Sequence, residues 1–131
     1  MLLISLMRRR RGLLIALTAL AVVFITSGIW GHHARRQAVA QNTVRAEKLK
    51  VAIDQRLPPG TLESDVVPAL KRDYPGYVVW PGANATEYAL PVGDEPSDVW
   101  YCGSWTRGVK LRFESGRLVS TSVERWSLDC L

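Results

Sequence analysis

Two cysteines, Cys102 and Cys130, offer the most chemistry in this sequence of 131 residues. A redox motif usually has the spacing C-x-x-C, whereas 27 residues lie between these two. A zinc site needs about four ligands, and the only histidines, His32 and His33, are adjacent residues near the N-terminus. A nucleophilic thiol needs a base beside it, and no pattern indicates one. In an exported protein a disulfide is the usual state of such a pair, so we predict one; in the cytosol we would expect two free thiols.

Three carboxylates, Asp94, Glu95 and Asp98, stand close together in the segment PVGDEPSD. They could bind calcium or form an acid–base pair, but the segment lacks the spaced oxygen ligands of an EF-hand. Its prolines and glycine predict a loop, and we interpret it as a solvated acidic loop. The sequence also lacks the G-x-S-x-G, P-loop and Rossmann glycine motifs. We therefore predict no catalytic, cofactor or metal site and a protein that is not an enzyme, with an undetected envelope hydrolase as an alternative.

Four tryptophans are many for so small a domain: Trp80, Trp100, Trp105 and Trp126. Core packing and cross-strand pairing are one explanation, because indole rings bury a large apolar area. An aromatic contact surface for a partner is the other, since aromatic side chains are enriched at protein interfaces. The sequence leaves both explanations open.

An apolar segment, residues 13–30, precedes all of these side chains and determines the compartment in which they lie. It holds 18 residues without an ionisable side chain, or about 27 Å of helix, close to the thickness of a bilayer's hydrocarbon core. Trp30 would lie at the far interface, where indole rings are favoured. Four consecutive basic residues precede the segment: Arg8, Arg9, Arg10 and Arg11. We predict a transmembrane signal anchor in residues 13–30 after a cytoplasmic basic N-terminus in residues 1–12.

Other roles for this segment are a cleaved signal peptide, a twin-arginine export signal or a buried core helix. A signal peptide usually has an apolar region of only about 7–15 residues, and any arginine run before an apolar segment can imitate the twin-arginine pattern. A core helix would show a polar stripe. Basic residues flank the segment on both sides, so charge alone does not set its orientation. Because long C-terminal domains are translocated largely regardless of charge, we predict a cytoplasmic N-terminus and an exported C-terminal domain.

The net charge of +5 does not indicate a nucleic-acid-binding protein. The N-terminal arginines supply most of it, and from residue 58 onward there are 7 basic and 10 acidic residues. Nucleic-acid modules carry clustered positive charge on their folded part. We therefore predict the membrane and an envelope protein as partners, and no nucleic acid.

The segments after the anchor predict an α+β domain. Residues 31–57 have the pattern of a helical stalk and a first helix, which Pro58-Pro59-Gly60 ends. Thr61 is predicted to cap a second helix. We expect Pro68 to kink or divide that helix, which ends by Asp73.

The C-terminal residues predict β-strands that end in a hairpin. Apolar alternation there favours a three-residue loop, Glu114-Ser115-Gly116, which places Leu111 opposite Val119. In that register Cys102 and Cys130 face the same side of the sheet, and one bulge brings them opposite each other. The hairpin therefore supports the predicted disulfide.

Residues 57–123 resemble the small SmpA/OmlA (BamE-like) domains of bacterial envelopes. The matching positions are Pro59, Gly60, Thr61, Val66 and Leu70 at the second helix, and Leu111, Phe113, Gly116 and Leu118 in the late hairpin. The resemblance implies a two-helix layer on a three- or four-stranded antiparallel sheet and a non-enzymatic role as an envelope interaction module. Those domains usually follow an acylated cysteine, which this N-terminus lacks, so a role in outer-membrane protein assembly is not carried over.

The chain also resembles pilin-like proteins of type IV pili and type II secretion systems, in which basic residues and a glycine precede an apolar helix, a stalk and a sheet. Gly12 after Arg11 fits their processing site, but Leu17 stands where they carry a glutamate. We predict a single-pass protein of the bacterial inner membrane. Its periplasmic α+β domain, residues 58–131, is expected to bind a protein partner or to have a structural role, with a pilin-like subunit as the alternative.

Overall fold

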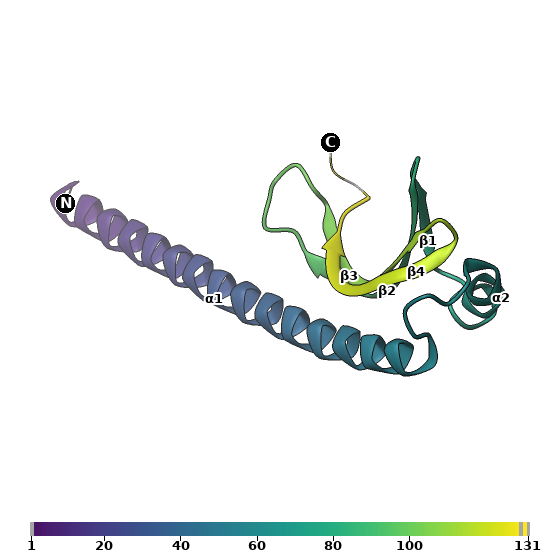
Figure 1. Cartoon of the computed structure of the whole chain (residues 1–131). Helices are drawn as coiled ribbons and strands as arrows, with labels where there is room; N and C mark the ends of the chain where they lie inside the picture. Colours follow the sequence, from purple (N-terminus) through teal and green to yellow (C-terminus); the bar gives the residue numbers. More distant parts are fainter. Residues whose placement is uncertain (1, 129, 131) are drawn as a thin grey trace. The chain divides into compact units, whose positions relative to one another are not determined.

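The computed structural model describes the backbone of residues 2–128 and 130, and the side chains of residues 14–128 and 130. Two helices precede four strands: α1 Leu2–Arg56, α2 Glu63–Asp73, β1 Val78–Pro81, β2 Ala85–Pro96, β3 Ser104–Glu114 and β4 Arg117–Trp126 (Figure 1). The chain separates into two compact units, Met1–Arg36 and Gln37–Leu131. The α+β class predicted from the sequence is confirmed.

The strands form one antiparallel sheet in the order β1-β2-β3-β4. Each strand pairs with the next one along the chain, so short connections suffice throughout. One face of the sheet carries the hydrophobic core, because alternate side chains of a strand point to the same side. The buried core residues are Ile53 from α1, Val66 and Leu70 from α2, and Tyr88, Leu90, Val109, Leu111, Phe113 and Leu118 from the sheet.

The expected layer of two helices is present only in part. The predicted anchor, stalk and first helix all belong to one continuous helix, α1, of 55 residues. Near its end Ile53 is buried in the core, with Leu49 and Leu57 packed beside it. The shorter α2 adds Val66 and Leu70 to the same core.

The beginning of α2 differs from the prediction. Thr61 does not cap the helix; its hydroxyl donates to the Pro58 carbonyl at 2.6 Å, and Leu62 occupies the N-cap position without a side-chain hydrogen bond. Pro68 lies inside a single helix, Glu63–Asp73, and does not divide it. The helix therefore begins without a polar cap, although the residue type of Thr61 would suit one.

Backbone hydrogen bonds join the start of α2 to the last hairpin. The Gly60 N–H donates to the Leu118 carbonyl at 2.7 Å, and the Leu118 N–H donates to the Thr61 carbonyl at 2.9 Å. One residue into the helix, the Glu63 N–H donates to the Gly116 carbonyl at 2.8 Å. The Glu63 bond satisfies one of the N–H groups that a helix start leaves without an intrahelical partner, and the other two join the preceding residues to β4, so the position of α2 depends on the β3–β4 hairpin.

The predicted three-residue loop of this hairpin is wrong. The turn has two residues, Ser115 and Gly116, and both have positive φ, 50° and 73°, as tight hairpin turns of type I′ require. Phe113 then opposes Leu118, and a register shift follows. This bulge leaves Val119 outside the ladder and about half exposed. Beyond the bulge Leu111 opposes Thr121, so the core-facing side of β3 stays paired without a longer loop.

Most of the segment predicted as an acidic loop belongs to a strand, because β2 continues to Pro96, whereas Ser97 and Asp98 lie in the connection to β3. The ladder with β1 ends at Ala89, so β2 has only one neighbour beyond that residue. The register with β3 shifts between Pro91 and Gly93. A strand edge and a bulge are the two settings in which a strand tolerates proline, which explains why the prolines do not end β2.

Gly108 allows β3 to lie close to its neighbours. A Cβ atom at this position would collide with the Leu90 carbonyl and lie 2.7 Å from the Trp126 ring. We expect Gly108→Ala to lower the free energy of unfolding by about 3 kcal/mol, measured by thermal unfolding of the full chain in detergent. Gly76→Ala is the control, because its Cβ would meet nothing nearer than Pro91 at 3.9 Å. Equal stability of the two variants would contradict the close packing at Gly108.

Candidate functional site

Cys102 and Cys130 lie at disulfide distance, as the sequence predicts. Their sulfur atoms are 1.85 Å apart and their Cα atoms 4.2 Å apart. They oppose each other in an isolated antiparallel bridge that continues the register of β3 and β4, in which Thr106 opposes Trp126. No further bulge is needed, because the bulge near the turn has already set this register.

The loop between β2 and β3 presents an aromatic tip, formed by Trp100 and Tyr101, beside this disulfide. Trp100 is 93% exposed and Tyr101 43% exposed, and their rings meet edge to face with centroids 5.8 Å apart. Leu128, two residues before Cys130, is 63% exposed. The sequence singled out Trp100 but missed Tyr101 and Leu128, because exposure cannot be read from residue type.

Local hydrogen bonds fix the loop that carries the tip. The Ser97 hydroxyl donates to the Val99 carbonyl at 2.8 Å and accepts from the Val99 N–H at 3.1 Å. The Cys102 N–H donates to the same carbonyl at 3.4 Å. Together with the disulfide, these bonds hold the residues on both sides of the aromatic tip.

The other tryptophans lie in different surroundings. Trp126 is buried, and its ring meets that of Trp80 edge to face at 5.8 Å; the Lys110 ammonium lies 4.9 Å from the Trp80 ring centre. The Trp105 indole donates to the Asp98 carboxylate at 2.9 Å, and the Arg125 guanidinium lies 4.7 Å from its ring. The structure thus does not bring the four predicted tryptophans together on one surface.

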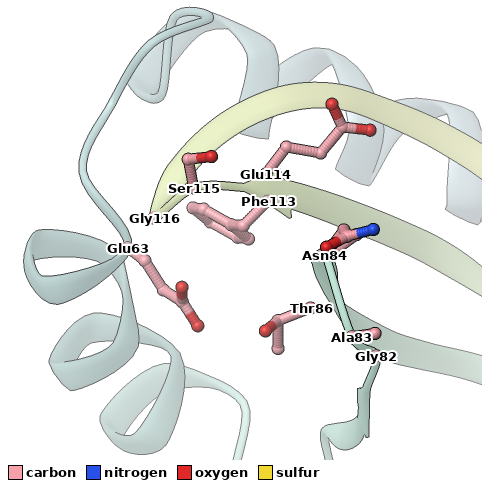
Figure 2. Close-up of a pocket in the computed structure, with 10 residues that line it drawn as sticks. Glu63, Gly82, Ala83, Asn84, Thr86, Phe113, Glu114, Ser115 and Gly116 are labelled. Atoms are coloured by element: carbon pink, nitrogen blue, oxygen red, sulfur yellow. The ribbon is translucent and has the colours of Figure 1, made fainter.

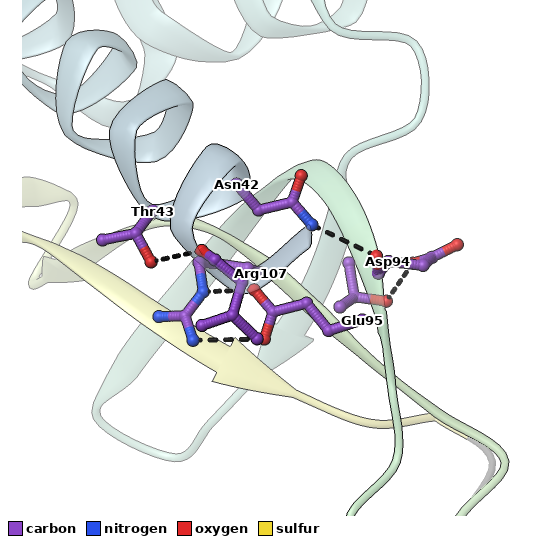
Figure 3. Close-up of polar contacts among 7 residues, drawn as sticks. Asn42, Thr43, Asp94, Glu95 and Arg107 are labelled. Carbon is purple, nitrogen blue, oxygen red and sulfur yellow. Dashed lines mark hydrogen bonds and ion pairs between the residues drawn. The ribbon is translucent and has the colours of Figure 1, made fainter. Parts of the chain in front are cut away.

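The three acidic residues predicted to share a solvated loop have different hydrogen-bond partners, and Glu95 is only 2% exposed. Its carboxylate accepts two hydrogen bonds from Arg107, at 2.5 and 3.1 Å (Figure 3). Asp94 accepts from the Thr106 hydroxyl at 2.8 Å, and Asp98 is bonded to Trp105. The interpretation of this segment as a solvated acidic loop is therefore wrong for Glu95. A paired guanidinium is the usual condition for burying a carboxylate.

Asn42 of α1 packs against the same part of β2. It is 6% exposed, and its side-chain amide donates to the Asp94 carbonyl at 3.1 Å (Figure 3). A side chain at Gly93 would collide with it, so this glycine permits the close approach. The domain therefore includes residues of α1 that the sequence assigned to a stalk.

A groove of about 560 Å³ opens at the other end of the sheet (Figure 2). Its lining residues are Glu63, Gly82, Ala83, Asn84, Ala85, Thr86, Phe113, Glu114, Ser115 and Gly116. Glu63 points across the groove toward Thr86 and accepts a hydrogen bond from the Tyr88 hydroxyl at 2.6 Å. Burial of Tyr88, and then this bond, raises the pKa of Tyr88 to about 12.

Within the described part of the chain, no group of three or more His, Cys, Asp or Glu side chains could hold a metal ion.

The described residues of α1 include one stretch long and apolar enough to cross a membrane, and none of that stretch is buried. Its large apolar side chains, from Leu14 to Trp30, are all at least 52% exposed. The predicted topology determinants belong to the same helix, but their side chains lie outside the described residues: Arg8, Arg9, Arg10 and Arg11.

No protein-family model, curated protein or solved structure matches the chain. The resemblance to SmpA/OmlA domains and the resemblance to pilin-like proteins both stay predictions. Function is therefore inferred from the apolar stretch of α1, the disulfide and the exposed side chains.

The buried pair gives a test of how this end of the domain is held. Arg107→Leu would leave the Glu95 carboxylate buried without its partner, so we expect a loss of about 3 kcal/mol in urea unfolding of the full chain in detergent. Arg112→Leu on the same strand is the control, because its ion pair with Glu114 is about half exposed and should contribute less than about 1 kcal/mol.

A second substitution separates the buried charge from lost packing. Adding Glu95→Leu to Arg107→Leu removes the isolated carboxylate and should restore part of the lost stability. If Arg107→Leu and Arg112→Leu unfold at the same urea concentration, the buried pair does not hold this part of the sheet.

Proposed function

We propose that this chain is a single-pass membrane protein of the bacterial inner membrane, with an exported α+β domain that acts as an interaction or structural module. The observation that carries the proposal is the apolar stretch of α1, which no described part of the protein buries. Such a stretch is stable in lipid and costly to leave in water. Because α1 continues into the second unit without interruption, a span in the membrane would tether the domain directly to it.

The disulfide supports export of the domain. Disulfides persist in oxidising compartments such as the periplasm and are rare in the cytosol. Cys102 and Cys130 pair within the sheet register, so the folded domain holds them at bonding distance without rearrangement. This favours a cytoplasmic N-terminus and a periplasmic domain.

The class of interaction module is supported by the contact between the two segments that resemble SmpA/OmlA domains. Gly60 and Thr61 exchange backbone hydrogen bonds with Leu118, and Val66 and Leu111 belong to one core. The segments that carry the resemblance thus form one packed unit. We propose binding of a protein partner, and no enzymatic activity, on this basis.

A pilin-like subunit is the second candidate, favoured by the continuity of α1. One helix runs from Leu2 to Arg56 and contributes Ile53 to the domain core, an arrangement that fits a subunit assembled through its apolar half. Mass spectrometry of the mature protein distinguishes the two candidates. Cleavage after Gly12 would favour the pilin-like subunit, and an uncleaved N-terminus would favour the anchored module.

Reporter fusions test the proposed topology. Alkaline phosphatase fused after Leu131 should be active, because that enzyme needs an oxidising compartment to form its disulfides. β-Galactosidase fused at the same position is the control and should be inactive when exported. The opposite pattern would place the domain in the cytoplasm and would remove the basis for the disulfide.

Photo-crosslinking in intact cells tests the proposed binding role. A photoreactive residue is placed singly at Val44, Val79 or Val119, three exposed positions on α1, β1 and β4. We expect an adduct of one discrete mass from at least one position, reduced when excess unlabelled protein is expressed, because a specific site is saturable. Adducts absent from all three positions, or not reduced by competition, would argue against an interaction module.

A further inference from the structure

We propose that the aromatic tip, Trp100 and Tyr101, is a second membrane contact that inserts into the headgroup region of the bilayer. This inference rests on the proposed anchoring of the chain by α1. It assigns a role to the most exposed aromatic side chain of the domain, which packing does not explain. Trp100 is 93% exposed and has no role in the core.

The side-chain types at the tip suit a lipid headgroup region. Trp and Tyr combine an apolar ring with a polar group, and both are enriched where membrane and water meet. Here the two rings stand edge to face with centroids 5.8 Å apart. A contact of this composition buries apolar area while the indole N–H and phenol O–H keep polar partners.

The loop is held in shape before any contact. Ser97 bonds twice to Val99, and the disulfide fixes Cys102 next to Tyr101. A binding loop that is already ordered loses less conformational freedom when it binds. An exposed aromatic residue on a free chain end would lose more conformational freedom on binding than this ordered loop does.

The Asp98 carboxylate, two residues before Trp100 in the sequence, does not oppose contact with anionic lipid. Asp98 accepts a hydrogen bond from the Trp105 indole at 2.9 Å, and the Arg125 guanidinium lies 3.7 Å from its other oxygen. Its charge is therefore balanced inside the domain. An unpaired carboxylate beside the tip would be repelled by a negative membrane surface.

Chain length keeps the tip within reach of the membrane. Asn42 of α1 is bonded to Asp94 of β2, and β2 leads from there into the loop of the tip. Twelve residue steps separate Trp30 from Asn42 in the sequence, which is about 18 Å where the chain is helical. The six steps from Asp94 to Trp100 can extend up to about 20 Å. A tether this short raises the effective concentration of the tip at the bilayer, so even a weak contact is populated.

Quenching of tryptophan fluorescence by brominated lipid tests the proposal. The full chain is placed in phosphatidylcholine vesicles that contain some phosphatidylglycerol, with bromine near the top of the acyl chains or with no bromine. The contribution of each tryptophan is the difference in bromine quenching between the unsubstituted chain and the variant in which that tryptophan is replaced by Phe. The variants are Trp30→Phe, Trp100→Phe and the control Trp105→Phe. We expect the components of Trp30 and Trp100 to agree within about twofold, because both rings would lie at the interface. The Trp105 component should be small, since Asp98 and Arg125 hold that ring.

The outcomes separate this proposal from the anchoring on which it rests. Quenching of Trp30 without quenching of Trp100 would overturn the lipid contact and leave the anchor intact. Quenching of neither would overturn both. A third outcome is that Trp100 is shielded from an aqueous quencher in native membranes but is not quenched by bromine in pure lipid. This would show that a protein covers the tip and would also overturn the proposal. Unchanged circular dichroism of Trp100→Phe verifies that the variant is folded.

Discussion

The register of the β3–β4 hairpin is the constraint on which most of the domain depends. A two-residue turn and the bulge after it place Leu111 and Phe113 in the core. They also turn the backbone of Leu118 toward Gly60, which fixes the start of α2. The same register continues to the cysteine bridge. A slip by one residue would exchange core and solvent faces along the whole strand. The core packing, the start of α2 and the cysteine bridge would then all be lost.

Toward the other end of the sheet, polar contacts add to the apolar ones. Glu95 and Arg107 form a buried ion pair, and Asn42 bonds to the strand next to it. Burying charges brings little net stability, because desolvation offsets much of the attraction. Polar partners are directional, however, so they can fix one placement of α1 on β2 where apolar contacts would allow several. The apolar core and this polar contact therefore contribute differently: the first supplies free energy and the second selects geometry.

The sequence predicted those features that depend on long segments or on a strong bias in composition, namely the apolar stretch and the α+β class. The cysteine pair was predicted from the expected oxidising compartment and from the hairpin. The hairpin loop was mispredicted because Val119 improves the alternation of a longer loop, whereas a bulge excludes that residue. The sequence did not predict the full extent of β2, because its prolines are typical of a loop. Since β1 pairs with β2 only as far as Ala89, the rest of β2 is an edge strand, where proline is tolerated. Thr61 has the residue type of a cap, yet its hydroxyl bonds to the Pro58 carbonyl, and the Glu63 N–H at the helix start bonds to the Gly116 carbonyl. In β2 the ladder with β3 overrode the local signal of the prolines, whereas in the hairpin a local bulge overrode the apolar alternation.

The cysteine bridge also changes what the end of the chain can do under load. It closes a covalent ring of 28 residue steps around β3 and β4. Hairpins resist pulling poorly when their ladder bonds break one after another from an open end, but this hairpin has no open end. A force that separates the ends of β3 and β4 would meet the covalent link before it could peel β4 from β3. The bridge thus keeps the ends of β3 and β4 together even where the ladder hydrogen bonds between them break.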